Sequence, residues 1–273
     1  MKIKHRSFFI VLLALQFSCG QEQDYFPSKT AIDNSSVAYL KFVHAASDTV
    51  GVNYFLGDLK VTAGTPSTLT GTTNTNIGTV PYLNAFPITD YTTVTPGALA
   101  SKVIVPEFYT TTKTYGTKTL NTGNVSLVAG SSYTVAFVGV TPAYETVLLS
   151  DDLSTAPIDG KAYIKFANFI HNSPGLSLRA TPPVNKDGTV NAPVILFSNI
   201  AYKSASGFTA LPLTGTYTSV QIIDESIIPP KVIATLASNV STFSDNKVYT
   251  IFARGQIGVT GAKAPGGNRI INR

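Results

Sequence analysis

The sequence predicts an all-β protein made of two tandem immunoglobulin-like antiparallel β-sandwich domains. From residue 37 onward, apolar residues fall in short alternating runs such as AYLKFVHA and SYTVAFVGV, bounded by Gly, Pro, Asn, Asp and Thr. Alternation with a period of two is typical of half-buried strands, and no window keeps apolar residues at helical spacing long enough to form a helix. Many short strands separated by turn residues favour sandwiches.

Internal repetition is the second observation behind this fold class. AYLKF begins at Ala38 and AYIKF at Ala162, SSYTVAFVG around Tyr133 returns as NKVYTIFARG around Tyr249, and YTTVTPG returns loosely as FTALPLTG. Three matched segments in the same order indicate a duplicated domain. We therefore predict a first domain over 37–153, a linker over 154–160 and a second domain over 161–273.

The two copies differ mostly in insertions. The first carries a Thr/Gly-rich segment, Thr62 to Val80, which predicts a long exposed hairpin or loop. The second carries Asp187-Gly188, a pair typical of a type I′ hairpin turn. Loops of this kind on a repeated scaffold are frequent binding sites.

Residues 1–19 predict a secretory signal peptide. Three basic residues precede the apolar run Phe8–Phe17, which is too short to cross a bilayer as a helix. The run ends at Ser18-Cys19-Gly20, which resembles a lipobox, although Gln16 stands where an apolar residue is usual. We predict that Cys19 is acylated and anchors the protein in a membrane. The alternative is an ordinary cleaved signal with an incidental cysteine.

Residues 20–36 are polar, lack apolar periodicity and predict a tether. Their first residues, Gln21 to Asp24, resemble the short acidic signal that directs some lipoproteins to the outer face of the outer membrane. The expected location is the outer membrane, with the folded part exposed at the cell surface rather than facing the periplasm.

Charge and cysteine content limit the classes of function. The formal charge of +5 falls when the three basic residues of the signal leave, because 17 basic residues then face 15 acidic ones. A nearly neutral exported protein lacks the basic surface that nucleic acid requires. Cys19 is the single cysteine, so its acylation leaves no disulfide and no thiolate metal ligand. We predict no cofactor.

The strand motifs resemble those of a tandem domain of unknown function numbered 4397, found in secreted and lipid-anchored bacterial proteins. The matching segments are Lys41-Phe42-Val43-His44, AGSSYTV from Ala129 and LLSDD from Leu148 in the first copy, and Lys165-Phe166, HNSP from His171, Gly215-Thr216-Tyr217 and Tyr249-Thr250 in the second. The first copy has Ala46-Ser47 where Ser-Pro is usual, and the second is expected to insert residues before His171. The resemblance implies an immunoglobulin-like sandwich and an envelope role, and it carries over no catalytic residue.

Enzyme signatures are absent from the sequence, and we predict a non-enzymatic protein. Outside the signal, the histidines are His44 and His171, which we place at comparable positions at the end of the first strand of each domain. Ser47, His44 and Asp48 hold the residue types of a catalytic triad, but neighbours in one turn rarely converge as a triad requires. We interpret His44, Asp48, His171 and Asn172 as turn residues of the family motif.

Two further site hypotheses concern a metal ion and a covalent modification. Asp151, Asp152 and Asp159 offer oxygens near the domain junction, but Ca²⁺ takes six to eight oxygen ligands and no Asp-x-Asp-x-Asp loop is present, so no metal site is predicted. Asp48-Thr49-Val50 resembles a bacterial O-glycosylation sequence, with Thr49 as the acceptor.

The predicted function is binding, adhesion or scaffolding at the cell envelope, with a surface protein or glycan as partner. The alternative is an accessory glycan- or nutrient-binding lipoprotein of an outer-membrane uptake system. The chain has no tryptophan, the favoured platform for sugars, so tyrosine would have to serve instead. A hydrolase with a His-centred site is the third hypothesis.

Overall fold

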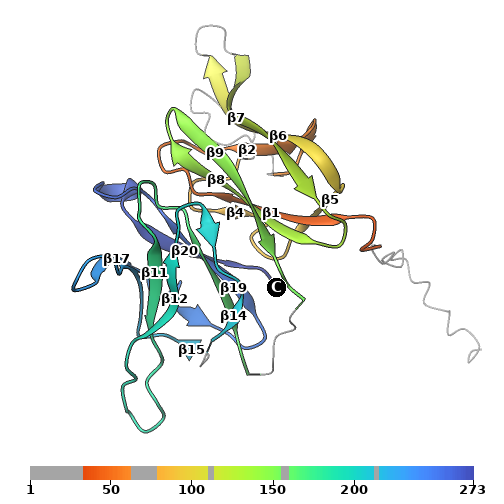
Figure 1. The fold of residues 1–273 in the computed structure, drawn as a ribbon. Helices are drawn as coiled ribbons and strands as arrows, with labels where there is room; N and C mark the ends of the chain where they lie inside the picture. Colours follow the sequence, from red (N-terminus) through yellow and green to blue (C-terminus); the bar gives the residue numbers. More distant parts are fainter. Residues whose placement is uncertain (1–32, 63–78, 110–113, 155–159, 212–214) are drawn as a thin grey trace, which may run out of the picture. The chain divides into compact units, whose positions relative to one another are not determined.

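The computed structural model describes residues 33–62, 79–109, 114–154, 160–211 and 215–273, and the chain from Asn34 to Arg273 forms one compact unit. The fold is all-β, as predicted. Within the described ranges, twenty strands and one 3-10 helix, η1 (Gly261–Lys263), make up the regular structure (Figure 1). No helix in this part of the chain is long and apolar enough to span a membrane.

The first sandwich consists of two facing sheets. One sheet has the order β4-β1-β8-β9, with β5 also paired to β1, and the other has the order β3-β2-β6-β7. Their bounds are β1 (Ala38–His44), β2 (Asn53–Leu56), β3 (Leu59–Lys60), β4 (Ala85–Phe86), β5 (Thr92–Val94), β6 (Gly97–Tyr109), β7 (Thr114–Leu127), β8 (Ser132–Val140) and β9 (Ala143–Asp151). Phe42 stacks on Tyr54 with ring centroids 5.1 Å apart, so the apolar faces of β1 and β2 meet in the core.

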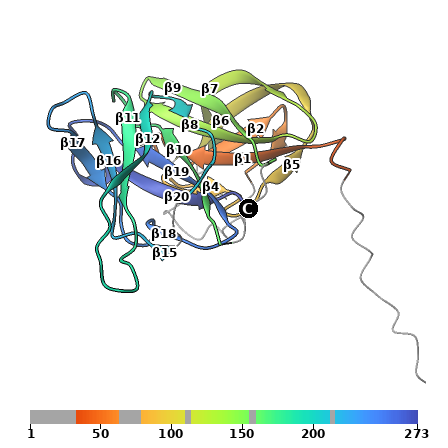
Figure 2. The same ribbon diagram turned by 60° about the horizontal axis from the view of Figure 1, so that its bottom comes forward.

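The second sandwich also has two main sheets, ordered β13-β10-β19-β20, with β14 paired to β10, and β12-β11-β16-β17. Figures 1 and 2 show β11 and β12 side by side in the latter sheet. The bounds are β10 (Tyr163–Asn168), β11 (Leu176–Thr181), β12 (Val194–Ile200), β13 (Ser204–Ala205), β14 (Thr209–Ala210), β15 (Gly215–Thr216), β16 (Ser219–Asp224), β17 (Lys231–Thr235), β18 (Thr242–Phe243), β19 (Val248–Arg254) and β20 (Gly266–Ile271). A short ribbon, β15-β18, adds Phe243 to the core.

The three repeated sequence segments occupy corresponding strands. AYLKF lies in β1 and YIKF in β10, SYTVAFVG lies in β8 and VYTIFAR in β19, and the third pair of segments contains β5 and β14. The registers also correspond, because Tyr39 pairs with Ser132 and Tyr163 pairs with Val248. Residues of the two copies can therefore be compared position by position.

The sheets are mainly antiparallel, as predicted, but each sandwich contains one parallel strand pair that the prediction did not include. β1 pairs with β8 in parallel, and β10 pairs with β19 in parallel. Parallel neighbours need a long crossover connection, and here the chain passes through the facing sheet between the two strands. Local alternation cannot reveal this pairing, since the two partners are far apart in sequence.

A third apolar cluster joins the two sandwiches. It contains residues of both copies, among them Val43, Ala136 and Val138 from the first and Phe169 and Phe252 from the second. Successive strand residues point to opposite faces, so β1 sends Leu40 and Phe42 into its own core and Val43 into this cluster. The strands β1, β8, β10 and β19 are consequently buried on both faces.

Two predicted loops have different outcomes. The segment Thr62 to Val80 falls mostly within 63–78, which lies outside the described residues. The Asp187-Gly188 hairpin is present, but its turn type was wrong. Gly188 has a φ of 86° whereas Asp187 is not among the residues with positive φ, and Gly188 N donates to Asn185 O at 2.9 Å. This is a type I turn followed by a left-handed glycine, the usual three-residue hairpin loop.

The shared cluster predicts that the two sandwiches unfold together. Replacing Phe252 by alanine should lower the free energy of unfolding by ~3–5 kcal/mol, because it removes a fully buried ring and leaves a cavity. Urea unfolding monitored by circular dichroism and by tyrosine fluorescence should show one shifted transition. Val190→Ala, in an exposed hairpin position, is the control and should change little. Two separate transitions, with one unshifted, would contradict the shared cluster.

Candidate functional site

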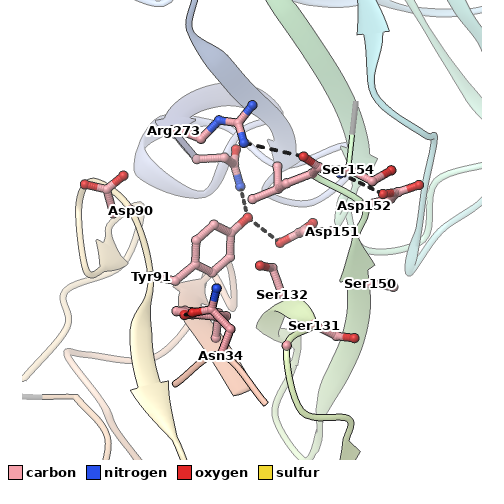
Figure 3. A pocket seen from close by; sticks show the side chains of 14 residues that line it. Asn34, Asp90, Tyr91, Ser131, Ser132, Ser150, Asp151, Asp152, Ser154 and Arg273 are labelled. Atoms are coloured by element: carbon pink, nitrogen blue, oxygen red, sulfur yellow. Dashed lines mark hydrogen bonds between the residues drawn. The ribbon is translucent and has the colours of Figure 1, made fainter. Parts of the chain in front are cut away.

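A cavity of about 860 Å³ lies where the two sandwiches meet, and Figure 3 shows its lining. Tyr39 reaches it from β1, Tyr91 from the turn before β5, and Asp151 from the end of β9. The second sandwich contributes Asn272 and Arg273, which follow β20. The lining therefore depends on contact between both copies.

Asp151 is the centre of the polar network behind this cavity. The residue is only 3% exposed, and both of its carboxylate oxygens accept hydrogen bonds. Oδ1 accepts from Lys165 Nζ at 2.7 Å, and Oδ2 accepts from Thr134 Oγ1 at 2.6 Å and from the Tyr91 hydroxyl at 2.8 Å. These bonds keep the carboxylate fixed and compensate its burial.

Two lysines at corresponding positions reach across the interface in opposite directions. Lys165 of β10 donates to Ser150 O in the first sandwich at 2.8 Å, and Lys41 of β1 donates to Ile271 O in the second at 3.0 Å. Each ammonium lies over an aromatic ring of its own sandwich, with Lys41 5.2 Å from the centre of Tyr91 and Lys165 5.4 Å from that of Phe208. The contact is thus nearly self-complementary, as in an isologous dimer.

The two copies differ at the position of Asp151. Thr250 Oγ1 donates to Asn272 Oδ1 at 2.8 Å, as Thr134 donates to Asp151, so Asn272 takes the place of Asp151 in the second copy. Asn272 Nδ2 also donates to the Tyr91 hydroxyl at 2.5 Å. Burial, followed by the charge of Asp151, raises the pKa of Tyr91 far above its usual value, so the phenol stays protonated and donates to Asp151.

Because Asn272 replaces the carboxylate, Lys41 and Lys165 have different hydrogen-bond acceptors. Its ammonium bonds two carbonyl oxygens, those of Ile271 and Pro87, whereas Lys165 bonds a carboxylate. Burial lowers the pKa of Lys41 to about 8, an effect that Asp90 and Asp151 partly oppose. Lys41 is therefore held by neutral acceptors, whereas Lys165 forms a buried ion pair.

The three aspartates considered as Ca²⁺ ligands do not form a common site in the described part of the chain. Asp151 has both oxygens occupied, and Asp152 Oδ1 accepts from Ser154 N at 2.9 Å. Hydrogen bonds from the side chain and then the backbone of Ser154 lower the pKa of the exposed Asp152 carboxyl. Asp159 lies outside the described residues. Among the residues that are described, no group of three His, Cys, Asp or Glu side chains is arranged to hold a metal ion.

His44 is buried at the end of β1, and its Nε2 lies 2.9 Å from Val50 O. A carbonyl only accepts, so Nε2 carries the proton. Burial lowers the pKa of His44 to about 4, although the bond to Val50 opposes this. Ser47 Oγ accepts from Gln256 Nε2 at 2.8 Å and Asp48 Oδ2 accepts from Thr141 N at 2.8 Å, so the hydrogen bonds of these three residues run to separate groups.

The pairing of His171 with His44 was wrong. The registers place Asn168 at the position of His44, and Asn168 Nδ2 donates to Pro174 O, the carbonyl six residues on, just as His44 bonds that of Val50. The expected insertion before His171 is therefore absent. His171 follows three residues later, with Nδ1 3.4 Å from the Tyr202 hydroxyl.

The turn residues Asn172 and Thr49 lie in the corresponding loops after β10 and β1. Asn172 has a φ of 59°, a left-handed conformation that asparagine tolerates well. Thr49 lines a second cavity, of about 490 Å³, together with Asp48, Val50 and Tyr144. Burial, followed by Asp48, raises the pKa of Tyr144 to about 12.

Sequence reasoning missed Lys41, Lys165, Tyr91 and Asn272, although one signal was present. AYLKF and AYIKF each place a lysine inside an otherwise apolar strand, and the repetition of that lysine in both copies indicates a shared structural role. Burying an ammonium costs too much free energy unless it has hydrogen-bond acceptors. The apolar strand around each lysine does not supply them, so acceptors on another element are expected.

His44→Asn should remove one source of acid sensitivity. The pKa of His44 is depressed in the folded state, so its contribution to stability is complete above about pH 6.5 and is lost as the pH falls towards 4, a change of ~3 kcal/mol. Asparagine, the residue of the second copy, can keep the bond to Val50 without titrating. Urea unfolding at pH 7 and pH 4 measures the difference. His171→Asn is the control and should lose stability as the wild type does; an equal loss in His44→Asn would exclude His44 as the cause.

Comparison with known proteins agrees with the motifs. A family model described as "Domain of unknown function (DUF4397)" matches residues 38–179, which is just over half of the chain. No curated protein sequence matches. A solved structure described as a putative cell adhesion protein from Bacteroides uniformis ATCC 8492 is similar at 9% identity and a TM-score of 0.28, over 87% of this chain and 96% of that one, a likeness too weak to inform function. The family match confirms the resemblance, and the chain belongs to the DUF4397 family.

Proposed function

We propose that this protein is a non-enzymatic, lipid-anchored component of the bacterial cell envelope that binds a surface partner in adhesion or scaffolding. In this proposal Cys19 is acylated, the outer membrane holds the anchor, and the two sandwiches are exposed at the cell surface. The arrangement of the two ends of the sandwiches supports it.

The chain enters the first sandwich at one end, and the connecting loops gather at the other. The Tyr39 hydroxyl bonds Asn34 at the start of β1, and from there β1 and β8 run in parallel. Past the ends of these strands, Thr141 N donates to Asp48, and Gln256 after β19 donates to Ser47. The loops following β1, β8 and β19 therefore meet at the end remote from Asn34.

These remote loops expose apolar side chains. Among them, Val50 in the loop after β1 is 67% exposed. Loops fixed on a rigid scaffold are frequent binding sites, and aliphatic side chains there gain free energy when a partner covers them. An anchor at the Asn34 end would present this loop surface outward.

Protease treatment of intact cells tests this proposal. The wild type should fractionate with membranes and be degraded by the external protease, whereas Cys19→Ala should lose the anchor and leave the membrane fraction. A periplasmic protein that stays intact is the control for unbroken cells. Membrane-bound wild type that is fully protected from the protease would contradict surface exposure, and an unchanged membrane fraction for Cys19→Ala would contradict lipid anchoring.

A further inference from the structure

We infer that the cavity beside Asp151 is a binding site for a short neutral carbohydrate. This goes beyond the proposed adhesion role, because the cavity lies at the Asn34 end and not among the remote loops. Its volume of about 860 Å³ falls within the range of small-molecule sites in proteins.

The chemistry of the lining matches a polyol. Apart from Leu153 and the glycine Gly130, the residues around the cavity carry hydroxyl, amide, carboxylate or guanidinium groups. Two of them, Tyr39 and Tyr91, also bring aromatic rings. Sugars present many hydroxyls that both donate and accept, together with weakly apolar C–H faces that pack on rings, so this mixture suits them better than a largely apolar ligand.

The wall of the cavity is already fixed without a ligand. The Tyr91 hydroxyl is held between Asp151 and Asn272, and Asp152 is held by the backbone of Ser154. Arg273 Nη1 donates to Leu153 O at 3.5 Å. Groups that are ordered before binding lose little conformational entropy on binding, which is an advantage for a ligand that gains only modest energy from each hydroxyl.

The charges around the cavity favour a neutral ligand. Asp151 is compensated by Lys165, which leaves the lining carboxylates of Asp90 and Asp152 against two positive charges. One is the guanidinium of Arg273 in the lining, and the other is the ammonium of Lys41, which is buried behind the ring of Tyr91. These two signs balance in number. A uronate or sulfate would meet the exposed carboxylates, and an amino sugar would meet the guanidinium, so charged sugars are disfavoured relative to neutral ones.

Asp90 offers a substitution that preserves the backbone. It is exposed and has a φ of 55°, a conformation that asparagine adopts readily, so Asp90→Asn should fold normally while losing the charge. Hydrogen bonds to an ionised acceptor are about twice as strong as neutral ones, and the loss should weaken sugar binding about tenfold. Asp187→Asn, in an exposed hairpin of the second sandwich, is the matched control.

The experiment screens the purified full-length protein on an array of neutral, acidic and amino glycans, and measures the best ligand by calorimetry with both variants. We expect neutral glycans to bind, Asp90→Asn to bind them about tenfold more weakly and Asp187→Asn to bind as the wild type does. Preference for charged glycans, equal binding by Asp90→Asn, or no neutral glycan bound more tightly than ~1 mM would overturn the inference. Each of these results leaves the protease test of surface anchoring unaffected.

Discussion

The structure depends on the burial of two lysines in the contact between the inner sheets of the two sandwiches. Lys41 and Lys165 stand in the middle of strands whose neighbours fill hydrophobic clusters on both faces. Removing an ammonium from water costs several kcal/mol unless hydrogen bonds and opposite charge replace the solvent. The carbonyl groups at the ends of β9 and β20 meet that requirement only when the sandwiches sit against each other, so the polar residues specify one arrangement of the apolar surfaces.

The near-symmetry of this contact explains where the cavity forms. Thr134 and Thr250 make corresponding bonds in the two copies, but the acceptor is Asp151 in the first and Asn272 in the second. The ring beside the lysine is Tyr91 in the first copy and Phe208 in the second. A carboxylate at both positions would place two negative charges beside Tyr91, whereas one acid and one amide let its hydroxyl donate to the first and accept from the second. This pairing orders the polar wall of the cavity, which connects the stability of the interface with the proposed carbohydrate site.

Strands and repeated segments could be predicted from the sequence, whereas contacts between residues far apart in the chain could not. Alternating runs located the strands, and the repeated segments located corresponding strands in both copies. Each of these signals is contained in a segment of a few residues. The parallel pairing of β1 with β8 joins residues far apart in sequence. His171 was matched to His44 by residue type, but the residue that makes the corresponding hydrogen bond is Asn168. The pocket residues Tyr91 and Asn272 carry no local pattern that reveals their meeting.

A double-mutant cycle on Lys165 and Asp151 tests the central claim most directly. If this pair holds the interface, Asp151→Asn and Lys165→Met should each lower the free energy of unfolding by ~3–5 kcal/mol, because each leaves a buried partner uncompensated. The double variant should cost clearly less than the sum, with a coupling energy above ~1 kcal/mol. Additive costs, with a coupling within ~0.5 kcal/mol, would show that the sandwiches are held together without the buried pair.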